Sequence, residues 1–342
     1  MTDRSMVSIG IVTYDSGAHI EACLDSVRRQ SFPSLEVLVI DNRSSDETVE
    51  LVERSRTPLR LMRNEHNRGY AAAHNQAIRL SHGEHYLALN PDVVMSPSFV
   101  EQMVKAIELE GSVGSVSGKL LRPAMGCGPS LIDSTGIYMT PNLRHLDRGS
   151  GQEDRGQYDR GEYVFGASGA AALYRRRMLE DVAVDGEYFD EDFFAYREDA
   201  DLAWRAQLLG WRAVYTPLAV ATHARRVVPE RRASLPKEIN MHSVKNRFLL
   251  RIKNQTLTEF FALLPPSLFR DLQVFGYVAL FERSSLPGLV FVARRLRKTW
   301  SKRRQIMARR RVSSRDMLRW FRRQPVAFEL ERFEDLAPVT TR

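Results

Sequence analysis

The turn Asn90-Pro91-Asp92 follows an apolar run, at a position where many nucleotide-handling enzymes hold a metal ion between two carboxylates. Here only Asp92 carries a carboxylate, so a metal site would need a second ligand from elsewhere in the chain. One candidate is His223, which precedes Arg225 and Arg226. A metal-bound diphosphate needs few protein ligands, because phosphate oxygens and water complete the shell, and it would attract those arginines. A lone histidine is nevertheless more often a surface or hydrogen-bonded residue than a ligand.

A second set of acids lies in the stretch YREDADLAW. Glu198, Asp199 and Asp201 fall in the first turn of an expected helix, where unpaired N–H groups and the helix dipole favour carboxylates without any function. The alternative is a general base. A carboxylate beside a cleft takes the proton from an attacking hydroxyl while a metal ion draws off negative charge on the other side.

Short apolar runs alternate with amphipathic stretches along the first part of the chain and must position these side chains. Strands are expected at 7–13, 35–41, 59–62 and 85–90, a helix at 19–30, and a second helix after a Ser44…Glu47 capping-box spacing. This alternation predicts an α/β fold with a parallel sheet covered on both faces. The ligand crevice of such a sheet lies beyond the carboxyl ends of its strands.

All four expected strand ends are polar, which predicts a nucleotide cleft. They are Thr13-Tyr14-Asp15, Asp41-Asn42-Arg43, Asn67 to Tyr70, and Asn90 to Asp92. Asp41 has two equally supported interpretations, binding of a nucleobase or ribose and closure of an Asx turn. Gly69 stands where the backbone could come close to a ligand. Asn67 and Asn75 could bind a base or sugar, although capping explains isolated asparagines more often.

Beyond Asp92 the pattern is less regular. A polar, Gly-rich segment at 141–161 resembles a mobile loop, a helix begins near Glu198 and is stopped by Gly210, and 211–217 returns as a strand. Neither GxxxxGK[ST] nor GxGxxG is present, which removes most support for a kinase or dehydrogenase. We predict a catalytic domain at 1–235 and a basic helical extension at 236–342.

Charge is distributed very unevenly along the 342 residues. Residues 1–223 contain 23 Lys+Arg and 32 Asp+Glu, whereas 224–342 contain 27 and 10, which together give the net charge of +8. The basic extension therefore predicts an anionic partner. Cys23 and Cys127 lack disulfide-framework or zinc spacing and are interpreted as ordinary thiols. The first eight residues lack an apolar signal segment, so we expect a cytoplasmic protein.

The extension is helical in pattern but too often interrupted by charges to span a bilayer. Apolar blocks such as LQVFGYVALF and SLPGLVFVA beside an arginine-rich helix suit interfacial attachment to anionic lipid. The alternatives are a solvated helical appendage and an oligomerisation element. We favour peripheral attachment to the inner face of the cell membrane.

The ordered set VSIGIVTYDS, LEVLVIDNRSSDET, NRGYAAAHN, LNPDVVM, GASGAAALYRR, FFAYREDADLAWRAQLLGW and ATH resembles the family 2 glycosyltransferases, in particular their bacterial rhamnosyltransferase-like and galactofuranosyltransferase-like branch. The resemblance covers about residues 7–223. It implies the GT-A fold, a Rossmann-like, mixed and mainly parallel sheet flanked by helices. It also implies an inverting hexosyltransferase that moves a sugar from a nucleotide diphosphate donor to an acceptor hydroxyl.

The resemblance assigns roles to particular residues. Thr13, Tyr14, Asp41, Asn42, Asn67, Gly69, Asn75, Asn90 and Asp92 would line the nucleotide-sugar site. Asp92 and His223 would hold Mg²⁺ or Mn²⁺, and Asp199 of the Glu198-Asp199 pair would be the general base. Asp15 and Arg43 depart from the residues usual in the family. Asn90 replaces the first acid of a DxD-type pair, in the Asn-Pro-Asp form frequent in the rhamnosyltransferase branch.

The implied partners are a dTDP- or UDP-sugar, with dTDP-L-rhamnose as the first candidate, and a glycan or lipid-linked saccharide acceptor of cell-surface polysaccharide synthesis. We expect no nucleic-acid partner, and a homo-oligomer stays open. Three alternatives remain: a sugar nucleotidyltransferase, whose glycine-rich basic signature is missing; a nucleic-acid-binding protein driven by the basic tail, without any recognised DNA or RNA motif; and a non-catalytic relative that binds nucleotide sugars.

Overall fold

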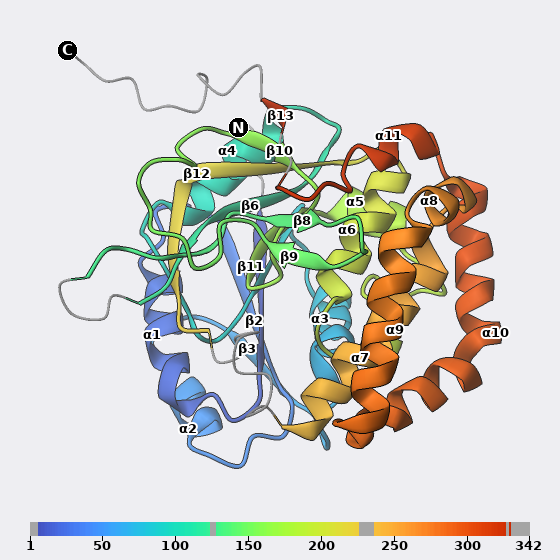
Figure 1. Ribbon diagram of the computed structural model, residues 1–342. Coiled ribbons are helices and arrows are strands. Elements are labelled where there is room, and N and C mark those ends of the chain that lie inside the picture. The colour runs from blue at the N-terminus through green and yellow to red at the C-terminus, as the bar shows by residue number, and fades with distance from the viewer. Residues whose placement is uncertain (1–5, 124–127, 226–235, 326–327, 330–342) are drawn as a thin grey trace.

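The computed structural model of the chain describes residues 6–123, 128–225, 236–325 and 328–329 (Figure 1). Cys127 and Arg226 of the sequence predictions lie outside these residues. Cys23 is a free, buried thiol. It packs in the hydrophobic core, as the prediction of an ordinary thiol requires.

A mixed sheet forms the centre of the molecule, and its parallel part carries the predicted strands. These are β1 (Val7–Thr13), β2 (Leu35–Asp41), β3 (Arg60–Arg63) and β4 (His85–Leu89). Strand β1 lies between β2 and β4, and β3 pairs with β2. The register places Thr13 opposite Asp41, so these two polar strand ends lie side by side.

The rest of the sheet is mostly antiparallel. Its strands are β5 (Val93–Met95), β6 (Val113–Leu121), β7 (Ile132–Ser134), β10 (Glu162–Val164), β11 (Ala171–Arg175), β12 (Arg212–His223) and β13 (Phe328–Glu329). Strand β11 lies antiparallel between β4 and β6, β12 runs parallel to β6, and β5 pairs with the end of β12. Part of the expected mobile loop is ordered, because β9 (His145–Asp147) pairs with β8 (Ile137–Met139).

Helices cover both faces of the sheet, as the alternating pattern predicts. They are α1 (Gly17–Arg28), α2 (Thr48–Arg54), α3 (Gly69–Leu80), α4 (Phe99–Glu108), α5 (Arg176–Val182), the 3-10 helix η1 (Glu191–Phe193) and α6 (Glu198–Leu208). Apolar residues of α1, α2 and α4 form one core cluster with the sheet, and those of α3, α5 and α6 belong to a second. The predicted capping box is wrong, because α2 has no side-chain cap and the Ser44 hydroxyl accepts its hydrogen bond from the Asp15 N–H instead.

The C-terminal helices pack against α6 and the sheet. They are α7 (Lys237–Asn254), α8 (Leu257–Ala262), α9 (Leu264–Leu280), the 3-10 helix η3 (Arg283–Ser285), α10 (Leu286–Arg309) and α11 (Ser314–Leu318). Leu250, Ile306 and Phe321 share a hydrophobic cluster with Phe165 and Trp204. Residues on both sides of the predicted boundary at 235 therefore build one core, and the division into two domains stays a prediction. No helix among the described residues is long and apolar enough to cross a membrane.

Buried ion pairs attach these C-terminal helices to the acidic body. The Lys302 ammonium of α10 bonds to Asp190 at 2.7 Å and to Glu187 at 2.8 Å, and the Lys253 ammonium of α7 bonds to Asp190 and Asp201. Each lysine is 1% exposed. The charge asymmetry predicts an anionic partner for the basic extension. Part of that partner is the acidic body of the same chain, which sequence analysis did not consider.

Replacing Lys302 by Ala should lower the free energy of unfolding by about 3–5 kcal/mol, because it leaves Asp190 and Glu187 short of a buried counter-charge. Urea denaturation followed by circular dichroism measures this. The control is Arg304→Ala on the exposed side of the same helix, for which we expect about 0.5 kcal/mol or less. Equal losses in the two variants would contradict a stabilising role for the buried pairs.

Candidate active site

The pairing of β5 with β12 brings together two predicted site residues that are distant in sequence. His223, the last residue of β12, lies opposite Val93, which directly follows the Asn90-Pro91-Asp92 turn. The His223 Nε2 is 3.4 Å from the Asp92 Oδ1. The main chain fixes the approach, since the Ala224 N–H donates to the Asp92 carbonyl at 3.0 Å.

A second carboxylate, which sequence analysis missed, orients His223 by bonding to the ring nitrogen that faces away from Asp92. Asp133 of β7 is fully buried, and its Oδ2 accepts a hydrogen bond from the His223 Nδ1 at 2.7 Å. Arg225 pairs with Asp133 at 3.0 Å and bonds to Asp147 at 2.6 Å. A single acid in the apolar run LIDS is the only sequence signal for Asp133, since its partner is known only once β7 and β12 are placed in the sheet.

These contacts determine the charge of the His223 imidazole in the absence of a metal ion. Burial disfavours the charged ring, but the hydrogen bonds to Asp133 and Asp92 outweigh burial and raise the pKa of His223 to about 9. Burial opposes ionisation of Asp92 as well, yet the bond to His223 holds the pKa of that carboxyl below its usual value. A divalent cation shared by Asp92 and His223 would have to displace the Nε2 proton.

The Glu198-Asp199 pair begins α6, where the sequence places it. The Asp199 Oδ2 accepts a hydrogen bond from the Gly169 N–H at 3.0 Å, and its Oδ1 accepts one from the Ala200 N–H at 2.7 Å. Burial raises the pKa of Asp199. Burial and the neighbouring Asp199 charge raise the pKa of Glu198 further. A raised pKa suits a carboxylate that must accept a proton near neutral pH.

The third acid of this helix has a structural role instead. Asp201 is fully buried and accepts hydrogen bonds from Arg205 at 3.0 Å, Lys253 at 2.8 Å and Asn254 at 2.7 Å. Two of these donors belong to α7. Of the three acids considered, Asp201 therefore holds the C-terminal helices, and Glu198 and Asp199 remain as candidates for chemistry.

The segment that leads into α6 has an unusual backbone. Phe194, Tyr196 and Arg197 have φ angles of 67°, 70° and 71°, a region that non-glycine residues rarely occupy. The Asn246 amide of α7 donates to the carbonyls of Phe193, Ala195 and Tyr196 at 2.7–3.0 Å. These bonds stabilise a backbone conformation that costs about 1–3 kcal/mol per strained residue. Asn246 is a further residue that sequence reasoning missed.

Gly69 is required by this same segment. Its φ is 79°, and a Cβ at this position would meet the Phe194 carbonyl oxygen at 2.6 Å. The Ala71 N–H donates to that carbonyl at 3.1 Å. The close backbone approach expected at Gly69 is therefore made to Phe194. Its predicted place beside the donor stays a prediction.

The polar residues at the ends of β1 and β2 form hydrogen bonds with one another. The Asp41 Oδ1 accepts hydrogen bonds from the Thr13 hydroxyl at 2.9 Å and the Ser44 hydroxyl at 2.5 Å. Its Oδ2 accepts one from the Ser44 N–H at 3.0 Å, so the Asp41 side chain closes the turn after β2. Asp15 and Arg43 have φ angles of 46° and 64°. The family-atypical residues at these two positions thus occupy left-handed turns, where asparagine and small residues cost less.

The predicted asparagines differ in their surroundings. Asn42 donates to the Gly69 carbonyl at 3.2 Å, and the Asn67 side chain accepts from the Gly69 N–H at 2.8 Å, so both shape the same loop. Asn75 is fully buried and forms two hydrogen bonds with the Phe189 backbone, at 2.8 and 2.9 Å. Its side chain therefore holds the chain segment that precedes α6. Asn90 is half-buried beside Asp92.

Tyr14 differs from the other predicted residues because its side chain is exposed. The Tyr14 side chain, one of the aromatic side chains at the predicted strand ends, is 51% exposed to solvent. An exposed ring at the end of β1 is available for stacking on a planar group such as a nucleobase.

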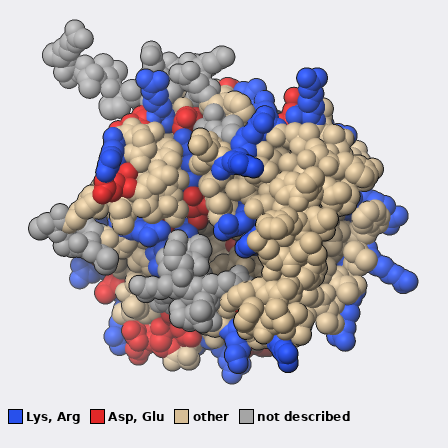
Figure 2. Space-filling view, viewed as in Figure 1, with Lys and Arg blue, Asp and Glu red and all other residues tan. Residues whose placement is uncertain are grey.

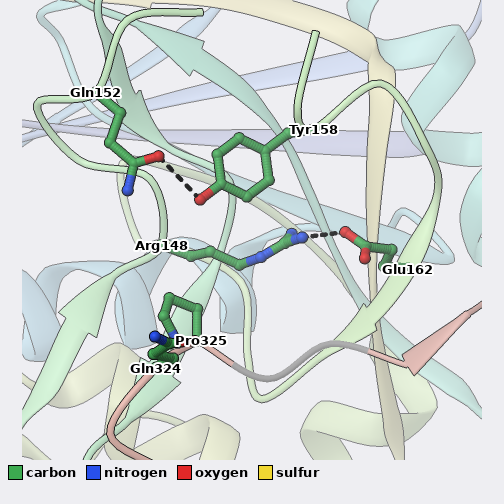
Figure 3. A pocket seen from close by; sticks show the side chains of 6 residues that line it. All are labelled: Arg148, Gln152, Tyr158, Glu162, Gln324 and Pro325. Carbon is green, nitrogen blue, oxygen red and sulfur yellow. Dashed lines mark hydrogen bonds and ion pairs between the residues drawn. The ribbon is translucent and has the colours of Figure 1, made fainter. Parts of the chain in front are cut away.

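A cavity of about 500 Å³ lies apart from all of these predicted residues. Its lining residues are Arg148, Gln152, Tyr158, Glu162, Gln324 and Pro325 (Figure 3). The Arg148 guanidinium lies 4.5 Å from the centre of the Tyr158 ring and forms an ion pair with Glu162. Its charge is thus already compensated within the cavity wall, and we assign no function to this cavity.

Comparisons with known proteins identify the family of the chain. The family model for glycosyl transferase family 2 matches residues 8–183, and the chain belongs to that family. The N-acetylglucosaminyl-diphospho-decaprenol L-rhamnosyltransferase of Mycobacterium tuberculosis is 28% identical over 256 residues, which cover 65% of this chain and 76% of that protein. The chain is therefore a family 2 glycosyltransferase.

Two solved structures show the same fold. Residues 1–349 of Staphylococcus aureus TarS, in complex with UDP-GlcNAc, are 19% identical, with a TM-score of 0.54 over 89% of this chain and 90% of that one. The mannosyltransferase PcManGT of Pyrobaculum calidifontis, in complex with GDP-Man and Mn²⁺, is 19% identical, with a TM-score of 0.51 over 90% and 86%. The predicted GT-A fold, a mixed central sheet flanked by helices, is confirmed.

Replacing Asn246 by Ala should loosen the segment before α6, because the carbonyls of Ala195 and Tyr196 lose their side-chain donor and the loss of such a bond costs about 1–3 kcal/mol where the group is buried. We expect faster hydrogen–deuterium exchange in peptides that cover 193–201, measured by mass spectrometry. Lys237→Ala, an exposed change at the start of α7, is the control and should leave that exchange unchanged. Identical exchange in the Asn246 variant and the unmodified protein would show that Asn246 does not hold the segment.

Proposed function

We propose that this protein is an inverting, metal-dependent hexosyltransferase that uses the Asp92–His223 edge of the sheet as its donor diphosphate site. The observation that carries the proposal is the 3.4 Å approach of the His223 Nε2 to the Asp92 Oδ1, with Asp133 orienting the ring. A carboxylate behind a ligating histidine is the usual outer-shell arrangement of metal sites, because it fixes the tautomer and the ring orientation.

The donor proposed first is dTDP-L-rhamnose, with UDP-sugars next. Support comes from the Asn90-Pro91-Asp92 turn and from the L-rhamnosyltransferase activity named for the mycobacterial relative. The acceptor is a hydroxyl of a glycan or lipid-linked saccharide in cell-surface polysaccharide synthesis. The base and ribose would lie near Thr13, Tyr14, Asp41 and Asn42, whose strand ends adjoin.

The residues present fit a divalent cation, Mg²⁺ or Mn²⁺. Asp92 supplies an oxygen ligand and His223 a nitrogen, and no group of three or more such side chains occurs among the described residues. Two protein ligands suffice where the donor diphosphate and water provide the remainder. When bound, the cation neutralises charge that develops on the departing nucleoside diphosphate.

The chain's own residues would then carry out a single displacement. The Asp199 carboxylate takes the proton of the acceptor hydroxyl, whose oxygen forms a bond to the anomeric carbon. The bond from that carbon to the diphosphate oxygen breaks on the opposite face, and its electron pair leaves with the nucleoside diphosphate. The Gly169 N–H, bonded to the Asp199 Oδ2, holds the carboxylate in place through the transfer.

The rival functions have less support. A nucleic-acid-binding protein would use the cations of the tail, yet part of them are paired within the chain: Lys298 and Arg295 with Asp192, and Arg311 with Asp181. A non-catalytic relative would bind a nucleotide sugar without turnover. The protein is proposed to act in the cytoplasm, peripherally on the inner face of the cell membrane, and a homo-oligomer is part of the same proposal.

Replacing Asp199 by Asn should leave donor binding within about twofold and lower turnover by about 10²–10⁴, because only proton transfer is lost. Transfer is assayed with a panel of nucleotide sugars that begins with dTDP-L-rhamnose, and donor affinity is measured by calorimetry. Glu198→Gln is the comparison, since it separates the two neighbouring acids. Full turnover in the Asp199 variant would exclude it as the base, and a wild-type protein that binds donors without transfer would support the non-catalytic relative.

Replacing Asp133 by Asn should weaken Mn²⁺ binding about 10- to 100-fold, because His223 loses its orienting carboxylate. His223→Ala and Asp92→Asn, which remove the proposed ligands themselves, should weaken it more. Binding is measured by electron paramagnetic resonance of free Mn²⁺ in the presence of a nucleoside diphosphate. Asp25→Asn, an exposed acid on α1, is the control. Unchanged affinity in His223→Ala would contradict ligation.

A further inference from the structure

Helix α9 buries polar residues and exposes apolar ones, the reverse of an ordinary surface helix. The residues that it buries are Ser267, Asp271 and Val278, two of them polar. Large apolar side chains face outward, with Phe269 66% and Leu280 70% exposed. A helix of a water-soluble domain normally buries its apolar stripe and exposes its polar face.

A buried ion pair fixes this orientation. The Asp271 Oδ1 accepts hydrogen bonds from the Arg247 Nε at 3.0 Å and Nη2 at 2.8 Å, and its Oδ2 bonds to Arg251, with both arginines on α7. Turning α9 about its axis would bury its apolar side chains only by separating these charges. Removing one partner of such a pair leaves an uncompensated buried charge, which costs about 3–5 kcal/mol.

The outward apolar side chains form one continuous feature with those of the adjoining elements. We define the apolar face as Phe261, Phe269, Leu272, Phe275, Leu280 and Phe281, which are 44–76% exposed. Figure 2 shows an extended uncharged surface over the part of the molecule where Figure 1 draws α9. A large exposed apolar surface marks an interaction site, because water solvates it poorly.

The exposed charges of the segment 257–310, which carries the apolar face, are cations and not anions. Arg283 and, on the outer side of α10, Arg294, Arg297 and Arg304 are exposed. The acids of 257–310 are Glu259 and Asp271, which are buried, and Glu282, which is half-buried. Figure 2 shows blue side chains at the margin of the uncharged surface. An apolar centre with a cationic margin complements a layer of acyl chains beneath anionic headgroups.

We propose that the apolar face of α8–α9 inserts into the interfacial layer of an anionic lipid bilayer, with the arginines of α10 on the headgroups. Among the described residues no helix can cross a membrane, so α9 lies in the plane of the surface. A two-fold dimer through this face would set its cationic margin against a like-charged copy, which disfavours self-association. The inference deepens the proposed function by naming the surface on which a lipid-linked acceptor would be met, and its test requires no turnover.

The test is flotation of the full chain with vesicles of phosphatidylcholine alone and of equal parts phosphatidylcholine and phosphatidylglycerol, at low and at physiological salt. We expect binding to the anionic vesicles. The double variant Phe269→Ser and Phe281→Ser should bind at least about tenfold more weakly, because it removes two of the inserted side chains. Arg294→Gln should weaken binding about fivefold on anionic vesicles only.

Two matched variants control this experiment. Tyr14→Ser removes an exposed aromatic ring outside the apolar face, and Arg54→Gln removes an exposed cation on α2, so both should float like the unmodified protein. Thermal melting confirms that each variant is folded. Light scattering after size exclusion measures the oligomeric state without vesicles.

Three results would overturn the proposal. One is failure of the unmodified protein to bind anionic vesicles at low salt. Another is equal binding by the double phenylalanine variant. The third is a dimer without vesicles that this variant dissociates, which would make the apolar face a self-association interface. If the unmodified protein fails to bind vesicles but transfers sugar to a soluble acceptor, the membrane surface is rejected and the transferase function stands.

Discussion

The buried charges of Lys253 and Lys302 impose the constraint on which the arrangement of this molecule depends. An ammonium taken out of water costs several kcal/mol unless carboxylates meet it with good geometry. Asp190 meets both lysines, one from α7 and one from α10. Because Asp190 directly precedes η1, the anchor of the C-terminal helices lies a few residues before the Glu198-Asp199 pair. The helical extension and the proposed base are therefore held by one set of ion pairs.

That anchoring gives the C-terminal helices a part in the site itself. Three residues before α6 have left-handed backbone angles, a conformation that would relax if α7 were absent. Asn246 supplies the compensating hydrogen bonds from one side, and Ala71, next to the Gly69 loop, supplies one from the other. The strained segment thus joins the extension to the loop that follows β3. It fixes where α6 begins, and hence where Asp199 points.

Sequence patterns predict much of this arrangement, because strand ends and helix starts are local properties. The four strands of the parallel half and the start of α6 follow from periodicity, whereas the proximity of Asp92 and His223 follows from the family resemblance. Asp133 does not, since an isolated acid in an apolar run has no partner until β7 and β12 are placed in one sheet. The Ser44 capping box fails for a similar reason. The Asp15 N–H, which comes from the end of the neighbouring strand, donates to the Ser44 hydroxyl oxygen at 3.0 Å.

Hydropathy also misjudges the C-terminal helices, because it equates apolar with inside. Here the inside of α7, α9 and α10 contains many charges. Lys253, Asp271 and Lys302 are buried, and each has an opposite charge within hydrogen-bond distance. With these charges on the inner surface, most of the large apolar residues of α9 face outward. The same ion pairs that absorb the excess positive charge of the extension therefore create its exposed apolar face. A window average of hydropathy cannot show this, since it contains no information on which cation meets which acid.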